Sequence, residues 1–321
     1  MSTVPYLQPD EREAFLVDHG MIEEGPCNDS QRDWLESVNF HFLMGYARHY
    51  RNLINESHWE GPKNLTEIQS LVNSEDELAA FLAPWIRRAE THLRALTVKY
   101  YCEQQLHGEG YLDMESWAQP KKHLQLTMLK DIQRHGEPYV QDHIDERARQ
   151  AGFEVPEWCI SENRGTWLSL VQELPLWSVI DSFSIGTLGK FLLSCGCQPC
   201  GEKPVGDLVA AELDIGKNSF NKSVQCFGIT RNLIFHHQRI WMRPIPMNPG
   251  FAKDLDRRYK HFELRTTYKQ AHFVALASLS KLLPTDCREK YLEQLDLFLE
   301  LRPLLALGII QPPFLKFTPL S

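Results

Sequence analysis

The stretch FGITRNLIFHHQRIWMRP, residues 227–244, combines an apolar, helix-forming background with side chains that can cleave RNA. Transesterification of RNA needs a base near the 2′-hydroxyl, an acid for the leaving oxygen and a cation beside the phosphorane. Histidine suits either proton transfer because its reference pKa, about 6.5, lies near neutral pH, and arginine offers phosphate a charged, planar fork. The stretch therefore predicts a catalytic set of Arg231, Asn232 and His236.

Spacing along a helix constrains how these three side chains can cooperate. Asn232 and His236 are four residues apart and share a helix face, so the amide can orient the imidazole. Arg231 precedes His236 by five residues, which places it about 140° away around the helix. The arginine must then reach round the helix or serve the site of a partner subunit, so we expect a cleft between two copies of the chain.

A buried core helix explains the same residues without any chemistry. The apolar stripe of such a helix would contain Ile229, Leu233, His236 and Ile240. In that case His236 would be a hydrogen-bonded core histidine, and His237, four residues before Trp241, would pack against the indole. The residue pattern alone leaves both interpretations open.

Charge is distributed unevenly along the chain. The formal net charge of −8 argues against a protein that coats nucleic acid indiscriminately, yet residues 226–281 contain ten Lys or Arg and three acids, a net charge of +7. Because salt screens distant charges, such a basic zone can still engage a phosphate backbone. The candidate RNA-binding residues are His237, Arg239, Arg243, Arg257, Arg258, Lys260 and Arg265. For Arg239, an acidic neighbour is the alternative partner.

Helical periodicity dominates the sequence and strand-like alternation is scarce, which predicts an all-α fold. The pattern indicates a helical hairpin over 116–152 and a buried element over 174–194. We expect an N-terminal helical region, residues 1–72, and a helical core, residues 73–321, that together form one continuous unit.

The segment from residue 74 to residue 104 is expected to be the longest helix. A capping box at Ser74 and Glu77 marks its start, and Pro84 either kinks the helix or marks its true beginning. Glu90 and Arg94 lie four residues apart on one face, a spacing typical of an intrahelical ion pair. Support of a site or contact with RNA is the alternative role for this pair.

The eight cysteines are interpreted as reduced thiols or metal ligands, not as a disulfide framework. Cys195, Cys197 and Cys200, in the motif CGCQPC, could form a zinc knuckle with one further ligand. The spacing is not that of a standard zinc site, so we expect no cofactor and keep structural zinc as the alternative.

Several segments together resemble the abortive-infection (Abi-like, AbiD/AbiF type) proteins of bacteria. RNLIFHHQRIW, residues 231–241, is similar to the family signature Arg-Asn-x-x-x-His-His-x-Arg-Leu-Trp. IRRAETHLRA (86–95), LPLWSVIDSFSIGTLGKF (174–191) and NFHFLMGY (39–46) resemble three further family segments in matching order. The chain departs from the pattern at Phe42, where the family usually has arginine, and at Met242, where it has asparagine.

The resemblance implies a helical HEPN-type bundle with additional helices and a metal-independent endoribonuclease of phage defence or a toxin–antitoxin system. It further implies a homodimer, with the Arg-x4-His motifs of two chains facing each other, and a small non-coding RNA as partner. A catalytically silent RNA-binding scaffold of the same fold is the alternative. No secretory signal and no apolar run long enough to cross a bilayer is found, so we expect a cytoplasmic protein.

Overall fold

The computed structural model describes residues 6–23, 27–104, 108–117, 121–154, 162–195, 204–262, 264 and 269–312. Throughout these residues the chain is helical, and no β-strand is formed apart from one isolated bridge between Trp117 and Cys195. The predicted all-α class is therefore confirmed. Among the described helices, none is both long enough and apolar enough to span a membrane.

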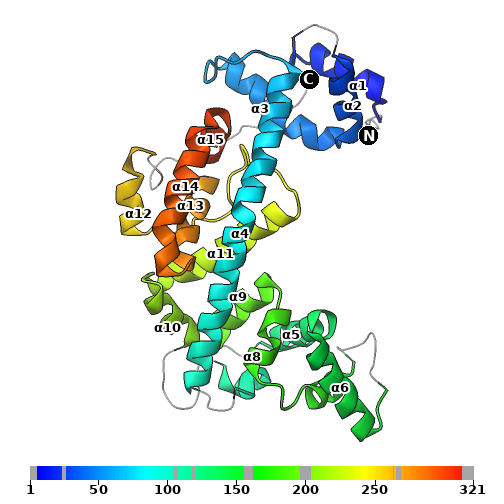
Figure 1. The fold of residues 1–321 in the computed structure, drawn as a ribbon, viewed down its shortest axis with the longest axis vertical. Helices are drawn as coiled ribbons and strands as arrows, with labels where there is room; N and C mark the ends of the chain where they lie inside the picture. The colour runs from blue at the N-terminus through cyan, green and yellow to red at the C-terminus, as the bar shows by residue number, and fades with distance from the viewer. Residues whose placement is uncertain are drawn as a thin grey trace.

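The helices gather around one long helix, α4 (Leu65–Gln104), which runs along the molecule from end to end (Figure 1). One end holds α1 (Pro9–Asp18), α2 (Asp29–Ser37) and α3 (Phe40–Asn55). The opposite end holds η1 (Gly110–Leu112), η2 (Met114–Ser116), α5 (Lys122–His135), α6 (Pro138–Ala151), α7 (Arg164–Leu170), α8 (Leu176–Val179) and η3 (Ile180–Ser182). Between these two groups lie α9 (Ile185–Ser194), α10 (Val205–Glu212), α11 (Lys217–Phe235), α12 (Lys253–Arg258), η4 (Lys260–Phe262), α13 (His272–Leu282), η5 (Thr285–Cys287), α14 (Arg288–Glu300) and α15 (Pro303–Ile310).

The long helix begins earlier than the sequence pattern predicts. It starts at Leu65, so the expected cap at Ser74 is wrong; the Ser74 hydroxyl instead donates to the Ser70 carbonyl, 2.8 Å away within the helix. Pro84 lies inside the helix and does not mark its start. The helix also runs without a break across the predicted division between residues 72 and 73.

The two helices predicted over 116–152 are present as α5 and α6, with a corner at Gly136 and with Pro138 in the first turn of α6, where no amide hydrogen is needed. They do not pack together as a hairpin would, because α5 packs mainly on α9 and η3 and α6 packs mainly on α7. The element expected over 174–194 is buried but is not one helix. It consists of α8, η3 and α9, and the Ser184 hydroxyl caps α9 by accepting from the Thr187 amide at 3.2 Å.

A buried polar cluster ties the segment after α11 to α4. The Glu75 carboxylate, 6% exposed, accepts from the backbone amides of Ile240 and Trp241, the latter at 3.2 Å. It also accepts a hydrogen bond from the Tyr46 hydroxyl and interacts electrostatically with the Arg239 guanidinium. The fully buried Trp241 ring stacks on Tyr46 with centroids 6.0 Å apart. Glu75 therefore links α3, α4 and residues 239–241.

Glu75 should make stability fall as pH rises. Burial raises the pKa of its carboxyl from 4.5 to about 7, so between these values the folded chain binds more protons than the unfolded chain. We expect the free energy of unfolding of the Glu75→Gln variant, taken relative to that of the parent protein, to rise by about 3 kcal/mol across this range. Urea unfolding of both proteins at several pH values measures this change.

A half-buried histidine, His49, and a buried one, His272, have the opposite effect on stability, so the comparison with the Glu75→Gln variant is needed. Burial lowers the pKa of His49 and of His272 from 6.5 to about 4, so each removes stability as pH falls through that interval. Both remain in the Glu75→Gln variant, and their contribution cancels in the difference. An equal stability difference at every pH would contradict the assignment to Glu75.

Candidate functional site

The candidate catalytic residues lie at the C-terminal end of α11. This helix buries one face, which comprises Phe220, Ser223, Val224, Phe227, Thr230, Leu233 and Ile234. The helix ends at Phe235 in a Schellman motif: the Gln238 amide donates to the Leu233 carbonyl at 2.9 Å, and the His237 amide donates to Ile234 at 3.2 Å. His237 takes the left-handed conformation, φ 52°, that such an ending requires.

Because the helix ends at Phe235, His236 is its capping residue, and its amide donates to the Asn232 carbonyl at 2.9 Å. The Asn232 side-chain oxygen accepts from Arg231 at 3.2 Å, and no hydrogen bond joins it to the His236 imidazole. The predicted partnership of Asn232 and His236 is therefore replaced by one between Asn232 and Arg231. The predicted packing of His237 on Trp241 also depended on a continued helix and is wrong.

His236 is exposed, which excludes its interpretation as a core histidine. Its neighbours Phe235 and His237 are exposed as well, and the Phe235 ring, 42% exposed, lies beneath the guanidinium of Arg231 at 5.1 Å from carbon to centroid. A half-buried arginine, an exposed aromatic ring and an exposed imidazole thus share one helix end.

Arg231 is held in place by a charged network that crosses three elements. Its Nε lies 3.6 Å from Glu90 Oε2 on α4. The other Glu90 oxygen lies 2.6 Å from Arg94, which confirms the predicted intrahelical pair. Arg94 in turn donates to the carbonyls of Ile180 and, at 2.8 Å, Phe183. Glu90 is thus shared by two arginines, and the sequence-based alternative in which it supports the site has a structural basis.

The network brings together segments that are far apart in the sequence. Residues 86–95 contribute Glu90 and Arg94, residues 174–191 contribute the carbonyls that bind Arg94, and residues 231–241 contribute Arg231. Residues 39–46 meet the same stretch from the other side, where a Cβ on Gly45 would lie 2.9 Å from Arg239 Nε. All four segments singled out in the sequence therefore surround the end of α11.

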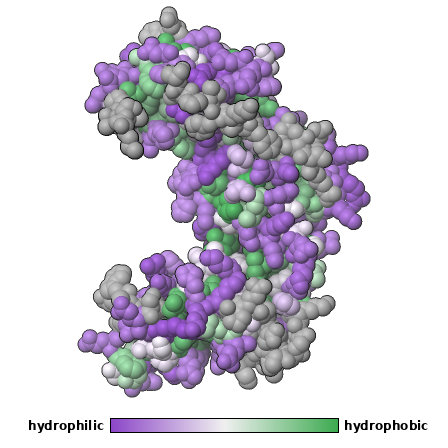
Figure 2. All heavy atoms as spheres, turned by 180° about the vertical axis from the view of Figure 1, so that it is seen from behind, coloured by the Kyte–Doolittle hydropathy of each residue, from purple (hydrophilic) through white to green (hydrophobic). Residues whose placement is uncertain are grey.

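The surroundings of this helix end are open. In Figure 1, α11 crosses α4, and its yellow end emerges on the side of α4 opposite α12, between the two ends of the molecule. Figure 2 shows from behind that the molecule is hollowed along this side, with apolar atoms in the middle of a largely hydrophilic face. The hollow leaves room for a large partner next to α11.

The candidate RNA-binding residues do not form one surface. Arg239 points inward, where its guanidinium lies 5.8 Å from the Tyr46 ring and its charge acts on Glu75, so an acidic neighbour is its partner. Arg243 is exposed and donates to the Gln238 side chain at 3.2 Å. His237, Arg257 and Lys260 are exposed, and Arg265 lies outside the described residues.

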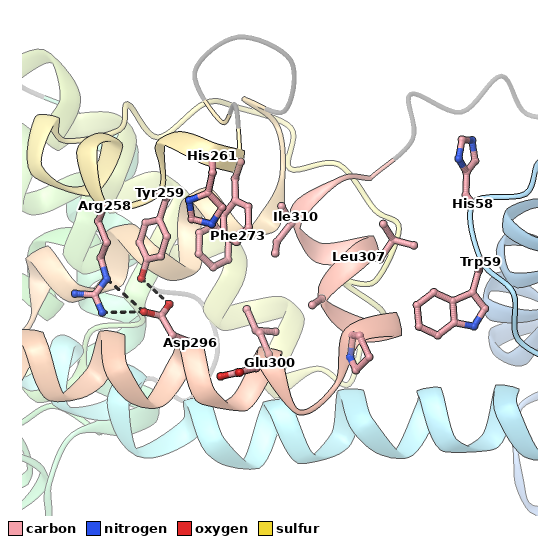
Figure 3. Close-up of a pocket in the computed structure, with 14 residues that line it drawn as sticks. His58, Trp59, Arg258, Tyr259, His261, Phe273, Asp296, Glu300, Leu307 and Ile310 are labelled. Atoms are coloured by element: carbon pink, nitrogen blue, oxygen red, sulfur yellow. Dashed lines mark hydrogen bonds and ion pairs between the residues drawn. The ribbon is translucent and has the colours of Figure 1, made fainter.

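Arg258 is neutralised by two carboxylates and lines a cavity of about 560 Å³ between η4, α14 and α15. It lies 2.8 Å from Asp296 and 2.5 Å from Glu289. Figure 3 shows Arg258, Tyr259 and Asp296 bonded together at one end of the cavity, with His58 and Trp59 at the other. Its lining is mainly aromatic and aliphatic, and none of the predicted catalytic side chains reaches it.

Of the proposed zinc ligands, only Cys195 belongs to the described residues. It is fully buried, burial raises the pKa of its thiol, and it bonds the Leu192 carbonyl. Cys197 and Cys200 lie outside the described residues. In the part of the chain that the structure describes, no group of three or more His, Cys, Asp or Glu is arranged to hold a metal ion.

Two features of the site have no signal in the sequence. Glu75 fixes the segment after His236 through contacts that span 165 residues, and its position within α4 resembles that of any helical glutamate. His272 is the first residue of α13, a position that gives no sign of a special role. Both of its ring nitrogens are nevertheless buried and without a hydrogen-bond partner among the described residues. Burial and the charges of Arg243 and Arg239 lower the pKa of its imidazole.

The chain matches the family model described as Abi-like protein over residues 33–242. The match begins in α2 and ends just after Trp241, so it includes α4, η3, α9 and the whole of α11. No curated protein and no solved structure gives a significant match to the chain.

Proposed function

Because this chain belongs to the Abi-like protein family, we propose that it is an endoribonuclease of abortive infection whose cleavage site is built around Arg231 and His236. Membership of the family indicates a role in defence against phage. The observation that carries the proposal is the end of α11, where an exposed imidazole follows an arginine that Glu90 and Asn232 orient.

The proposed reaction is a transesterification that uses side chains alone. The His236 imidazole of one copy takes the proton of the 2′-hydroxyl, the 2′-oxygen attacks phosphorus, and the P–O5′ bond breaks. An imidazole of the second copy protonates the leaving 5′-oxygen, and Arg231 stabilises the charge on the phosphorane. The products are a 2′,3′-cyclic phosphate and a 5′-hydroxyl. Cleavage should therefore persist in the presence of a metal chelator.

The need for two imidazoles is the reason for proposing a homodimer. His237 is the only histidine next to His236, and its left-handed backbone at the helix cap sends the chain away from the end of α11. Two copies that meet across the hollow beside α11 would bring two sets of Arg231 and His236 together. A small RNA bound in the same hollow could inhibit the assembled site.

Mixing parental chains with His236→Ala chains tests the shared site. The His236→Ala chain is expected to be inactive alone. If the site needs His236 of both copies, a mixed dimer is inactive, and equal amounts of the two chains paired at random keep about a quarter of the activity of the same total amount of parental protein. Sizing by light scattering verifies that dimers form.

The outcomes separate three interpretations. Half of the parental activity from verified mixed dimers would show that each site lies within a single chain. RNA binding without cleavage by the parent protein would favour the catalytically silent scaffold. Sequencing of RNA that co-purifies with the inactive protein identifies the RNA partner in either case.

Glu90 should act as a positioning residue. Glu90→Gln keeps the shape of the side chain but removes the charge that Arg231 and Arg94 share. We expect cleavage to fall about tenfold, mainly in kcat, because the arginine then approaches the phosphorane less accurately. Kinetics on a labelled RNA measure the change.

Glu103→Gln, an exposed position on the same helix, is the matched control and should leave both kinetic constants unchanged. If Glu90→Gln altered only the melting temperature and neither kinetic constant, Glu90 would have a purely structural role.

A further inference from the structure

At the opposite end of α11 from Arg231 lies a second cavity, of about 510 Å³, formed by α11, α13 and the segment that leads into α12. The lining combines charged and hydroxyl side chains with apolar surface in about equal parts. Its residues are Asp214, Ile215, Gly216, Ser219, Ser223, Gly250, Phe251, Ala252, Lys253, Asp254, Arg257, Ser278 and Lys281. This volume is within the range of small-ligand sites and would hold one nucleotide.

One wall of the cavity is the N-terminus of a long helix. Gly216 caps α11 without any side-chain hydrogen bond. The Ser219 amide donates to the Gly216 carbonyl at 2.8 Å, whereas the amides of Lys217 and Asn218 have no acceptor among the described residues. The partial positive charge of a helix N-terminus favours an anion at this place. Gly250 allows the opposite wall to come close, since a Cβ there would lie 2.9 Å from the Ser219 hydroxyl.

A second and independent observation comes from α13. Ser278 is 7% exposed and lines the cavity, yet its hydroxyl has no hydrogen-bond partner among the described residues. Buried hydroxyls in folded proteins are nearly always satisfied, because an unsatisfied one costs free energy. A ligand that brings an acceptor oxygen into the cavity would satisfy it.

The charges around the cavity favour an anion over a cation. Lys253, Arg257 and Lys281 line it against two acids, and one of these, Asp254, is already paired with Lys281 at 2.8 Å. Asp254 and the buried Lys281 thus balance each other, which leaves Lys253 and Arg257, among the described residues, as the free positive charges of the lining. Asp214, an exposed residue, is the remaining acid and would repel an anion.

We propose that this cavity binds a phosphomonoester of nucleotide size. The phosphate would accept hydrogen bonds from the first turn of α11 and from Ser278, with Lys253 and Arg257 beside it. A monoester suits the cavity better than a phosphodiester within a chain because it carries more charge and three acceptor oxygens. The ligand is either a free nucleotide or the phosphorylated 5′ end of an RNA.

The proposed site is separate from the cleavage site. The 19 residues of α11 span about 28 Å, so a ligand at Gly216 does not touch His236 of the same chain. Phosphate binding can therefore be measured whether or not the protein cleaves RNA.

Calorimetric titration of the full chain at low salt tests the proposal. Inorganic phosphate and nucleoside 5′-monophosphates should bind, and the parent nucleosides should not. If a mononucleotide binds as tightly as a 5′-phosphorylated trinucleotide, the ligand is a free nucleotide; tighter binding of the trinucleotide identifies an RNA end. Absence of heat with every phosphate compound would overturn the proposal.

Ser278→Ala and its neighbour Ser280→Ala form a matched pair on α13. Ser280 is also buried, but its hydroxyl bonds the Ala277 carbonyl at 2.7 Å and does not line the cavity. We expect Ser278→Ala to weaken binding of nucleoside monophosphate about tenfold without loss of stability, since its hydroxyl has no bond to lose. Ser280→Ala should lower the melting temperature and leave binding unchanged. Equal binding by the Ser278→Ala protein would contradict the proposal.

Asp214→Asn distinguishes an anion from a cation as the ligand. Removal of this exposed acid should tighten the binding of phosphate several-fold, because it removes repulsion from the rim of the cavity. The variant keeps the size of the side chain and so leaves the turn before α11 unchanged. Weaker phosphate binding by Asp214→Asn would mean that the carboxylate itself holds the ligand, and would overturn the assignment.

Discussion

Replacement of His236 with alanine is expected to lower the rate of RNA cleavage by about a hundred- to ten-thousandfold, the range typical of a lost general acid or base. The fold should be unaffected, because the imidazole is exposed and makes no hydrogen bond with the described residues. Cleavage of a labelled RNA by the purified variant, with thermal unfolding alongside, measures both effects. In cells, the same variant should lose any toxicity of the parent protein.

His123→Ala is the matched control for this experiment. His123 is an equally exposed histidine, on α5 at the far end of the molecule. The His123→Ala protein should cleave RNA at the parental rate. Parental cleavage by the His236→Ala protein would exclude His236 from the chemistry and leave the enzyme proposal without its central residue.

Glu75→Ala is expected to be the most destabilising change among the residues discussed, at about 3–5 kcal/mol. It removes the acceptor of two buried backbone amides, those of Ile240 and Trp241, and the carboxylate that acts on Arg239. Each unsatisfied amide costs free energy, and the arginine keeps a half-buried charge without compensation. Chemical denaturation at neutral pH measures the loss.

Glu77→Ala provides the comparison on the same helix. Glu77 pairs with Arg302 at 2.5 Å, but the pair is solvent-exposed, and such pairs contribute at most about 1 kcal/mol. A similar loss from both variants would mean that burial of Glu75 has no special role.

The fold class and the main helices follow from periodicity, because α4 buries the apolar face that the sequence displays. The start of α4 was missed since Ser74 and Glu77 reproduce a capping box by chance inside a 40-residue helix. Local patterns that mark a helix start carry no information about whether the preceding residues are already helical. In this case tertiary packing on α3 and the helices beside α4 decides.

The end of α11 was missed for a related reason. A Schellman ending is usually announced by glycine at the left-handed position, and here that position is His237. Without the glycine, the apolar spacing continues through Ile240 and suggests a longer helix. The candidate catalytic residues were nevertheless identifiable, because arginine and histidine in that motif are unusual within so apolar a stretch.

The contacts that orient the site depend on residues distant in sequence. Arg231 meets Glu90 across 141 positions, and Ile240 meets Glu75 across 165. The pair of Glu90 and Arg94 was predictable from spacing, whereas the arrival of Arg231 on the same carboxylate required the three-dimensional structure. The direction of Arg239 toward the interior likewise follows from the turn after the helix.

Two glutamates of α4, Glu75 and Glu90, together hold the segment of residues 231–241 in place. Glu90 grips that segment before the helix cap and Glu75 grips it after the cap, and both belong to one continuous helix, about 22 Å apart along its axis. The backbone around His236 is thus attached to the same helix, α4, on both sides of the helix cap. The conformational entropy of this loop is therefore lost when the chain folds and not when the proposed RNA substrate binds. That substrate would meet an imidazole whose backbone is already in position.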